Sequence, residues 1–385
     1  MTFLRILPFL LLTIGMFYYP QEVLSSATTG LKLWVSYILP ALFPFFVISD
    51  ILMKQGFVHF LGVLLEPLMR PLFRLPGKAS FILAMTHTSG IPIGAILTCK
   101  MRKDGEITRT EGERLLAFSS NPSPGFMFGA VASGMLANPA LGIIIAGSIY
   151  ISNLIVGLVF RFYGNPSSSP PKYKISLRMA WRELEIAQQK NNKPLGELIA
   201  ESVRESTSTI LLVGGFIVFF SVITQMLTVW NITGIIAGLI NILSAGMLSQ
   251  AGGVALINGL IETSLGCKAA VTAFSSLNIQ VGVLAFILGW GGLSVFAQVA
   301  SFTASTDLRF LPFFLGRTLH GFLALIISQI ILRYSEIPTT TLPSPLTDGS
   351  RIWLMSLRWS FLYFIGIIIF LTLMGIFLRL WKRPS

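Results

Sequence analysis

Long apolar runs, separated by short polar or basic stretches, dominate this chain. A helix needs roughly 20 apolar residues to cross the hydrocarbon core of a bilayer, so the pattern predicts transmembrane helices. Two further runs, 57–75 and 232–248, fit helices that lie in the membrane interface, and Glu66-Pro67 and Arg70-Pro71 interrupt the first of them. Eight runs are long enough to be predicted as spans: 4–19, 31–53, 115–136, 141–162, 210–230, 281–302, 311–332 and 359–380.

Composition supports a polytopic membrane protein. Of 385 residues, 53% are hydrophobic and 11% are charged, whereas soluble domains carry roughly 25% charged residues. The net charge of +12 does not indicate nucleic-acid binding, because the basic residues cluster at the ends of apolar runs, where they meet anionic lipid. Cys99 and Cys267 lie in or beside apolar runs, where they fit small packing residues better than a disulfide, and no metal-site spacing occurs. We therefore expect a lipid bilayer as partner, no nucleic acid, no metal and no cofactor.

Two apolar stretches, 79–98 and 252–276, carry polar residues at their centres and predict re-entrant hairpins. Basic residues flank the first stretch on both sides, so a simple crossing would violate the positive-inside tendency. The stretch is better explained by a segment that enters the membrane, breaks at Ser89-Gly90-Ile91-Pro92 and returns. The flanking residues are Arg70, Arg74 and Lys78 before it, and Lys100, Arg102, Lys103, Arg109 and Arg114 after it.

The order of runs, hairpins and interrupted spans repeats in the two halves of the chain. With the amino terminus in the cytoplasm, most of the 28 Lys and Arg residues fall inside, both termini are cytoplasmic, and the two halves begin on opposite sides. We therefore predict an all-α fold of two inverted repeats. The expected segments are an N-terminal transmembrane helix with outer loop (1–29), a first repeat containing hairpin 79–98 (30–163), a cytoplasmic polar linker (164–207), a second repeat containing hairpin 252–276 (208–333), and an outer loop with a C-terminal transmembrane helix (334–385).

The centres of the two hairpins are candidate substrate-binding sites. Each break would expose backbone N–H groups at the start of a half-helix, and this partial positive charge suits a carboxylate. Hydroxyl groups add further donors. The alternative is that these small residues only allow close helix packing. The candidates are Thr88, Ser89 and Gly90 in the first hairpin and Thr263, Ser264 and Gly266 in the second.

The spans that follow each hairpin are also interrupted. Two prolines in the segment 119–125 remove backbone donors from one span, and the glycine-rich segment 289–294 interrupts its counterpart. Unwound helices that face the hairpin tips would enclose a polar chamber. Asn121, Ser123 and Gln298 are candidates for direct substrate contact, although such residues also satisfy broken backbone locally.

Three ionisable residues lie on the predicted hairpins, and ionisable groups at membrane depth are functional candidates by default. Lys268 would either neutralise an anionic substrate or pair with Glu262. Glu262 and His87 are candidates for ion or proton coupling, but a lone histidine is commonly satisfied by backbone. His59 and His320 support no catalytic arrangement, so we do not expect an enzyme.

Three motifs, THTSGIPIGA at 86–95, SSNPSPGFMFGA at 119–130 and IETSLGCKAA at 261–270, resemble the YlbJ-type sporulation integral membrane proteins of spore-forming bacteria. These belong to a wider group that carries the nucleoside-recognition, or Gate, domain. The resemblance implies a fold similar to concentrative nucleoside transporters, with trimers as one possible homo-oligomer. It also implies transport of dipicolinic acid from the mother cell across the outer forespore membrane.

Three functions therefore compete at this stage. The first is transport of a small aromatic or heterocyclic anion, with dipicolinate as the leading substrate. The second is a nucleoside or nucleobase transporter that reads ribose and base edges with Asn121, Gln298 and Glu262. The third is a spore-envelope membrane scaffold without transport. The linker 164–207 fits a tether between halves, with a regulatory or docking role as its alternative.

Overall fold

The computed structural model describes residues 2–164, 176–190 and 193–334, and the regular elements in these ranges are all helices. The predicted all-α class is confirmed. Four helical stretches are long and apolar enough to cross a membrane, or up to six if each of two bent helix pairs counts as one span. The described residues thus support fewer than the eight predicted spans, and the predicted span 359–380 lies outside them. The division into five segments stays a prediction.

The predicted span 115–136 is interrupted at the segment 119–125, as its prolines predicted. α7 (Arg109–Phe118) ends early, residues 119–123 are not helical, and η2 (Gly125–Met135) continues as a π-helix. Pro122 and Pro124 explain the gap, because proline lacks the N–H that the helix ladder requires. The predicted spans 4–19 and 31–53 correspond to α1 (Thr2–Tyr18), followed by α2 (Pro20–Leu33), η1 (Trp34–Ile38) and α3 (Leu39–Lys54) in near-continuous succession.

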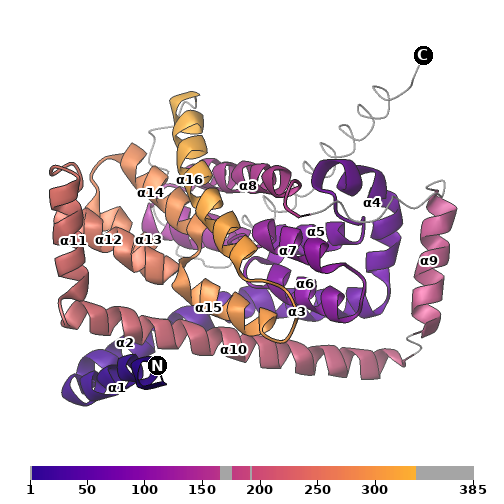
Figure 1. Ribbon diagram of the computed structural model, residues 1–385, viewed down its shortest axis with the longest axis horizontal. Helices are drawn as coiled ribbons and strands as arrows, with labels where there is room; N and C mark the ends of the chain where they lie inside the picture. The colour runs from indigo at the N-terminus through magenta and orange to yellow at the C-terminus, as the bar shows by residue number, and fades with distance from the viewer. Residues whose placement is uncertain (1, 165–175, 191–192, 335–385) are drawn as a thin grey trace.

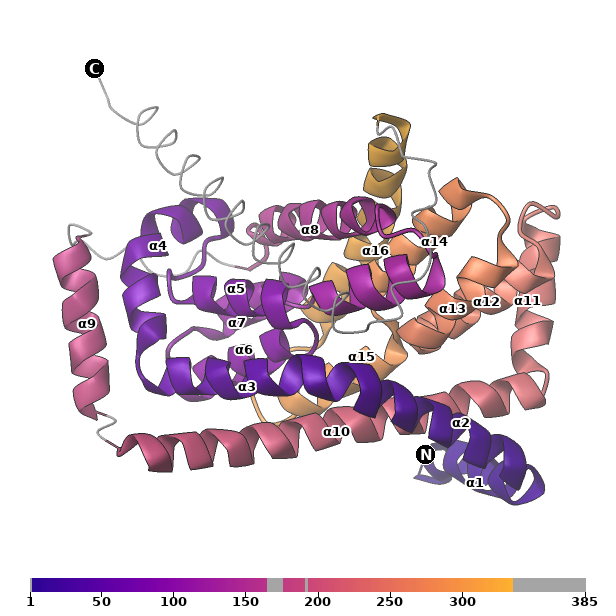
Figure 2. The ribbon, with the colours of Figure 1, turned by 180° about the vertical axis from the view of Figure 1, so that it is seen from behind.

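The same order of elements occurs twice along the chain. A helix is followed by a crosswise helix, a hairpin of two short helices, a broken helix and a long helix. Figures 1 and 2 show α4 and α11 crosswise at opposite ends of the molecule. The first set is α3, α4 (Phe57–Phe73), α5 (Ala79–Ser89), α6 (Ile93–Lys103), α7 with η2, and α8 (Leu141–Phe160). The second set is α10 (Leu195–Val229), α11 (Ile232–Leu243), α12 (Gln250–Ile261), α13 (Thr263–Ala273), α14 (Leu277–Trp290) with α15 (Gly292–Thr303), and α16 (Leu311–Tyr334).

Both hairpins consist of helices too short to cross a bilayer. α5 and α6 have 11 residues each, and α12 and α13 have 12 and 11. At 1.5 Å per residue each helix is about 16–18 Å long, roughly half of a 30 Å hydrocarbon core. Gly90 ends α5 with a φ of 87°, and Glu262 separates α12 from α13 in an extended conformation. The chain therefore breaks at both predicted hairpin centres.

The two ends of the first hairpin meet. Lys78, just before α5, forms an ion pair with Glu106, which lies in the loop after α6. His59 and Lys78 hold the pKa of the Glu106 carboxyl at about 2, well below its ordinary value. The chain thus returns to the end of the molecule from which α5 began. Further ion pairs at this charged end join Lys54 to Asp50 and Glu205, Lys100 to Asp50 and Glu205, Arg70 to Glu111, and Arg102 to Asp307.

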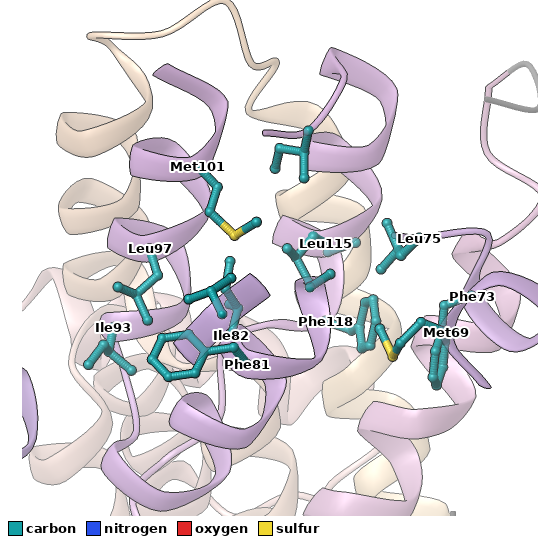
Figure 3. Close-up of a cluster of buried hydrophobic side chains, with 14 of the residues drawn as sticks. Met69, Phe73, Leu75, Phe81, Ile82, Ile93, Leu97, Met101, Leu115 and Phe118 are labelled. Carbon is teal, nitrogen blue, oxygen red and sulfur yellow. The ribbon is translucent and has the colours of Figure 1, made fainter. Parts of the chain in front are cut away.

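The linker helix and an apolar core hold the first hairpin in place. α9 (Leu177–Lys190) packs on α4, where the Trp181 ring lies 5.3 Å from the ring of Phe60. Burial of large apolar side chains, worth about 1.5–3 kcal/mol each, fixes α5 and α6 against α4 and α7. Figure 3 shows this cluster, which includes Met69, Phe73, Phe81, Ile82, Leu97, Met101, Leu115 and Phe118.

Candidate functional site

The two helix breaks meet at one side chain, Arg317 of α16. Its Nη1 donates to the carbonyl of Ser120 in the first break. Its Nε donates to the carbonyl of Trp290 at 3.0 Å, where the second break begins, and its Nη2 donates to the carbonyl of Leu288 at 3.0 Å. Arg317 is 0% exposed. The broken helices of the two halves are therefore joined by a single buried guanidinium.

The tip of the first hairpin packs directly on the first break. A Cβ added to Gly90 would lie 2.6 Å from the backbone nitrogen of Ser123. One added to Gly94 would lie 1.7 Å from the carbonyl oxygen of Ser119. Glycine is therefore required at both positions, because only a residue without Cβ permits such close backbone approach. Ser123 also accepts a hydrogen bond from the Phe126 backbone N–H through its hydroxyl, at 3.2 Å, near the start of η2.

The tip of the second hairpin packs on the second break in a similar manner. The Thr263 hydroxyl donates to the carbonyl of Gly291 at 2.6 Å. The indole N–H of Trp290 donates to the carbonyl of Leu260 at 3.1 Å. Within the hairpin, α12 and α13 cross at Gly259 and Gly266, where a Cβ on Gly266 would lie 2.0 Å from the Gly259 Cα. The predicted site residue Gly266 thus sets how closely the two helices approach.

Four buried polar atoms at the first hairpin tip and the first break lack a hydrogen-bond partner among the described residues. They are the hydroxyls of Ser89, Ser119 and Ser120 and the Oδ1 of Asn121, all on residues at most 1% exposed. Buried polar groups are nearly always hydrogen-bonded, so such a cluster indicates a place for water or ligand. A Cβ added to nearby Gly125 would have no heavy atom within 4 Å, which indicates open space at this end of η2.

His87 and Asn121 are brought together as a pair. The Nδ1 of His87 lies 2.7 Å from the carbonyl of Leu83, so Nδ1 carries the proton and donates. The Nε2 is then an acceptor for the Asn121 amide, whose Nδ2 lies 3.4 Å away. This pairing leaves the Asn121 Oδ1 facing elsewhere, without a partner. The Tyr150 ring packs on the imidazole at 5.0 Å and its hydroxyl donates to the His87 carbonyl.

Glu262 and Ser264 act locally at the start of α13. The Glu262 carboxylate accepts from the Leu265 backbone N–H at 2.8 Å and from the Ser264 hydroxyl at 2.6 Å, as an N-cap does. Lys268 is exposed on α13 and forms no ion pair with Glu262. The alternative in which those two residues neutralise each other is therefore not the arrangement found.

For the predicted site residues Gln298 and Thr88, the structure describes no side-chain hydrogen bond to either break. Gln298 is buried on α15, and its side chain forms no hydrogen bond with another described residue. Thr88 belongs to α5, but its side chain lies outside the described part of the structure. Within the described ranges, no group of three His, Cys, Asp or Glu side chains could hold a metal ion.

The sequence reasoning assigned no role to Arg317 or to its neighbour His320. The Nη1 of Arg317 lies 2.9 Å from the Nδ1 of His320, whose Nε2 lies 2.9 Å from the carbonyl of Ile149 on α8. The available signal was a lone arginine inside the apolar run 311–332. Intramembrane arginines are functional candidates by default, and this one lies between both breaks.

These observations define the class of protein: a helical integral membrane protein with two short-helix hairpins packed on two broken helices. Residues 35–169 match the family described as Gate, nucleoside recognition. The chain is 39% identical over 329 residues to the sporulation integral membrane protein YlbJ of Bacillus subtilis (strain 168), which covers 84% of this chain and 81% of that protein. The chain belongs to this family of sporulation integral membrane proteins, as the three motifs indicated.

A second relative is more distant. An uncharacterized protein of Alkalihalophilus pseudofirmus is 30% identical over 96 residues, which is 24% of this chain and 20% of that protein. No solved structure matches the chain. The family membership and the Gate match suggest a role related to membrane transport.

Proposed function

We propose that this protein is a carrier that moves a small anionic solute across a membrane of the sporulating cell, rather than an enzyme. The observation that carries the proposal is the meeting of the two helix breaks at Arg317. One hairpin tip packs on each break, and four buried polar atoms at the first tip and break have no partner among the described residues. Irregular backbone at membrane depth is tolerated only where protein covers it or it lines a watery cavity. Hairpins and broken helices around a central site are the usual construction of secondary transporters.

Inverted repeats would supply the two states that such a carrier needs. The repeated order of elements, with α4 and α11 at opposite ends of the molecule, supports this arrangement (Figure 1). In this proposal the ion-paired end of the molecule faces the cytoplasm, because basic residues favour that side. Both termini then lie in the cytoplasm, and the site is reached alternately from either side.

The leading substrate is dipicolinate, carried across the outer forespore membrane. Membership of the sporulation family supports the setting. A rigid dicarboxylate also suits the chemistry of the site, because the hydroxyls of Ser89, Ser119 and Ser120 are free to donate and Arg317 carries a positive charge. The polar groups of the site would then replace the water that hydrates the anion outside the membrane.

A nucleoside is the second candidate substrate, because the matched family is described by nucleoside recognition. The polar edges of the base and the hydroxyl groups of the ribose would form hydrogen bonds with Asn121 and Gln298. The two candidates differ in charge, so direct competition separates them. Uridine should displace radiolabelled dipicolinate weakly if the anion is the substrate, and strongly if the nucleoside is.

The test is counterflow of labelled dipicolinate and labelled uridine into liposomes that contain the purified protein, with and without proton or sodium gradients. We expect saturable dipicolinate uptake that is lost in Asn121→Ala and retained in the matched control Asn278→Ala, because Asn278 is exposed at the start of α14. Uptake no faster than in empty liposomes, for either solute under any gradient, contradicts the carrier and favours the scaffold.

A further inference from the structure

Arg317 is a buried cation whose described partners are all neutral. They are the carbonyls of Ser120, Leu288 and Trp290 and a ring nitrogen of His320. No carboxylate lies within ion-pair distance of Arg317 among the described residues. Burying a charge without an oppositely charged group beside it is costly, so a cation kept in such a place requires a physical reason.

The carbonyls that surround Arg317 belong to helix ends. Ser119 is the C-cap of α7 and Gly291 is the C-cap of α14, so Ser120, Leu288 and Trp290 lie at or next to two C-termini. A helix C-terminus carries a partial charge of about −0.5. Two such ends together approach the charge of one guanidinium. The contacts of Arg317 are thus made to dipoles, and a full negative charge binds a guanidinium more strongly than such dipoles do.

We infer that Arg317 is the anion-binding residue of the central site, and that a carboxylate bound there replaces the carbonyls of one break. This inference rests on the proposed function and names the group that recognises the charge of the substrate. A carboxylate accepts two parallel N–H bonds from a guanidinium, and these charge-assisted bonds are stronger than bonds to neutral carbonyls. The unpartnered hydroxyls of Ser119 and Ser120 lie in the same break and donate to the same anion.

The replacement couples binding to movement. In the structure, Arg317 ties the Ser120 carbonyl of one half to the Trp290 carbonyl of the other. When the anion takes those N–H groups, the tie between the two breaks is released. Binding then favours a state in which the halves rearrange, since a ligand shifts a conformational equilibrium through its different affinity for the two states.

The first experiment compares Arg317→Gln with Arg317→Lys and with a matched control, Arg114→Gln. Arg114 is also 0% exposed and donates to carbonyls, those of Arg74, Tyr163 and Gly164, but not to those of the two breaks. The ligands are dipicolinate and its neutral diamide, and their affinities are measured by equilibrium binding to purified protein. The size-exclusion profile of each variant reports whether it folds.

We expect Arg317→Gln to weaken dipicolinate binding by about tenfold or more, the usual effect of losing a hydrogen bond to a charged group. Arg317→Gln should change diamide binding much less. The affinity of Arg317→Lys for dipicolinate should lie between those of the wild type and Arg317→Gln. Arg114→Gln should keep the wild-type ratio of the dipicolinate and diamide affinities. Equal loss for both ligands, or unchanged dipicolinate binding, overturns the role of Arg317. Unchanged dipicolinate binding by Arg317→Gln contradicts only the role of Arg317 and not the proposed carrier function. A wild-type protein that binds neither ligand contradicts the carrier function as well.

A second measurement leaves Arg317 unaltered, in case its replacement prevents folding. Gly125→Cys places a thiol in the open space beside the first break, in a background without the native cysteines. Saturating dipicolinate should slow maleimide labelling of this thiol, and should do so at lower concentration than the diamide. An unchanged labelling rate removes the anion from this site and overturns the inference.

Discussion

The close crossing of the two helices in the second hairpin offers the sharpest test of the fold. Replacing Gly266 by alanine adds one methyl group where α13 crosses α12, 2.0 Å from the Gly259 Cα and 2.3 Å from its nitrogen. Both atoms are backbone, so no side chain can rotate away. Ordinary contact begins near 3.4 Å, so the two helices must separate locally by about 1.4 Å.

This separation of the helices should lower both the stability of the protein and its transport rate. Overpacking of this kind usually costs about 1–3 kcal/mol, and the rigid backbone neighbour places Gly266→Ala at about 3 kcal/mol. At about 2 °C per kcal/mol for a large domain, the apparent melting temperature should fall by about 6 °C. The Thr263 hydroxyl would also move away from the Gly291 carbonyl, now 2.6 Å distant, so transport should fall further than stability alone explains.

The assay is thermal unfolding in detergent, followed by tryptophan fluorescence, together with liposome flux below the melting temperature. The matched control is Gly238→Ala on α11, where an added Cβ meets nothing within 4 Å. That change should be neutral or stabilising by up to about 1 kcal/mol, since alanine favours helices over glycine. If Gly266→Ala has the melting temperature and transport rate of the wild type, α12 and α13 do not approach each other as closely at Gly266 as the structure shows.

Three further predictions concern the hairpins and their charges. Single cysteines at Pro76 and Asp104 should both react with a membrane-impermeant reagent only from the cytoplasmic side, and labelling from opposite faces contradicts a re-entrant first hairpin. Because the pKa of Glu106 is lowered to about 2, its ion pairs contribute stability above pH 4.5 that disappears as the pH falls towards 2. Glu106→Gln should therefore be less stable than the wild type at pH 7 by on the order of 1–2 kcal/mol after solvent screening, and the difference should vanish near pH 2 in thermal melts. Lys268→Ala should leave the uptake of the anion and of its neutral analogue close to the wild type, since Lys268 is exposed; a selective loss of anion uptake would restore its predicted charge-recognition role.

Local sequence was sufficient to place the breaks. Glycine and proline act on their own backbone and immediate neighbours, so the interruptions near Gly90, Pro122 and Gly291 could be predicted without knowing what they pack against. The break at Glu262 was also anticipated, because hydroxyls and a carboxylate interrupt an apolar run there. The membrane class followed from composition and run length, which depend on no tertiary contact.

Which side chains meet at those breaks depended on the packing of distant helices. Arg317 contacts carbonyls 27 and 197 residues away in sequence, and no local pattern encodes such pairs. Lys268 was a reasonable candidate for the charge of the site because it lies on a hairpin, but the crossing at Gly266 turns other residues of α13 towards α12 and leaves Lys268 exposed. Periodicity tells which residues share a helix face. Only the assembled helices determine which face is buried and which cation lies between the two halves.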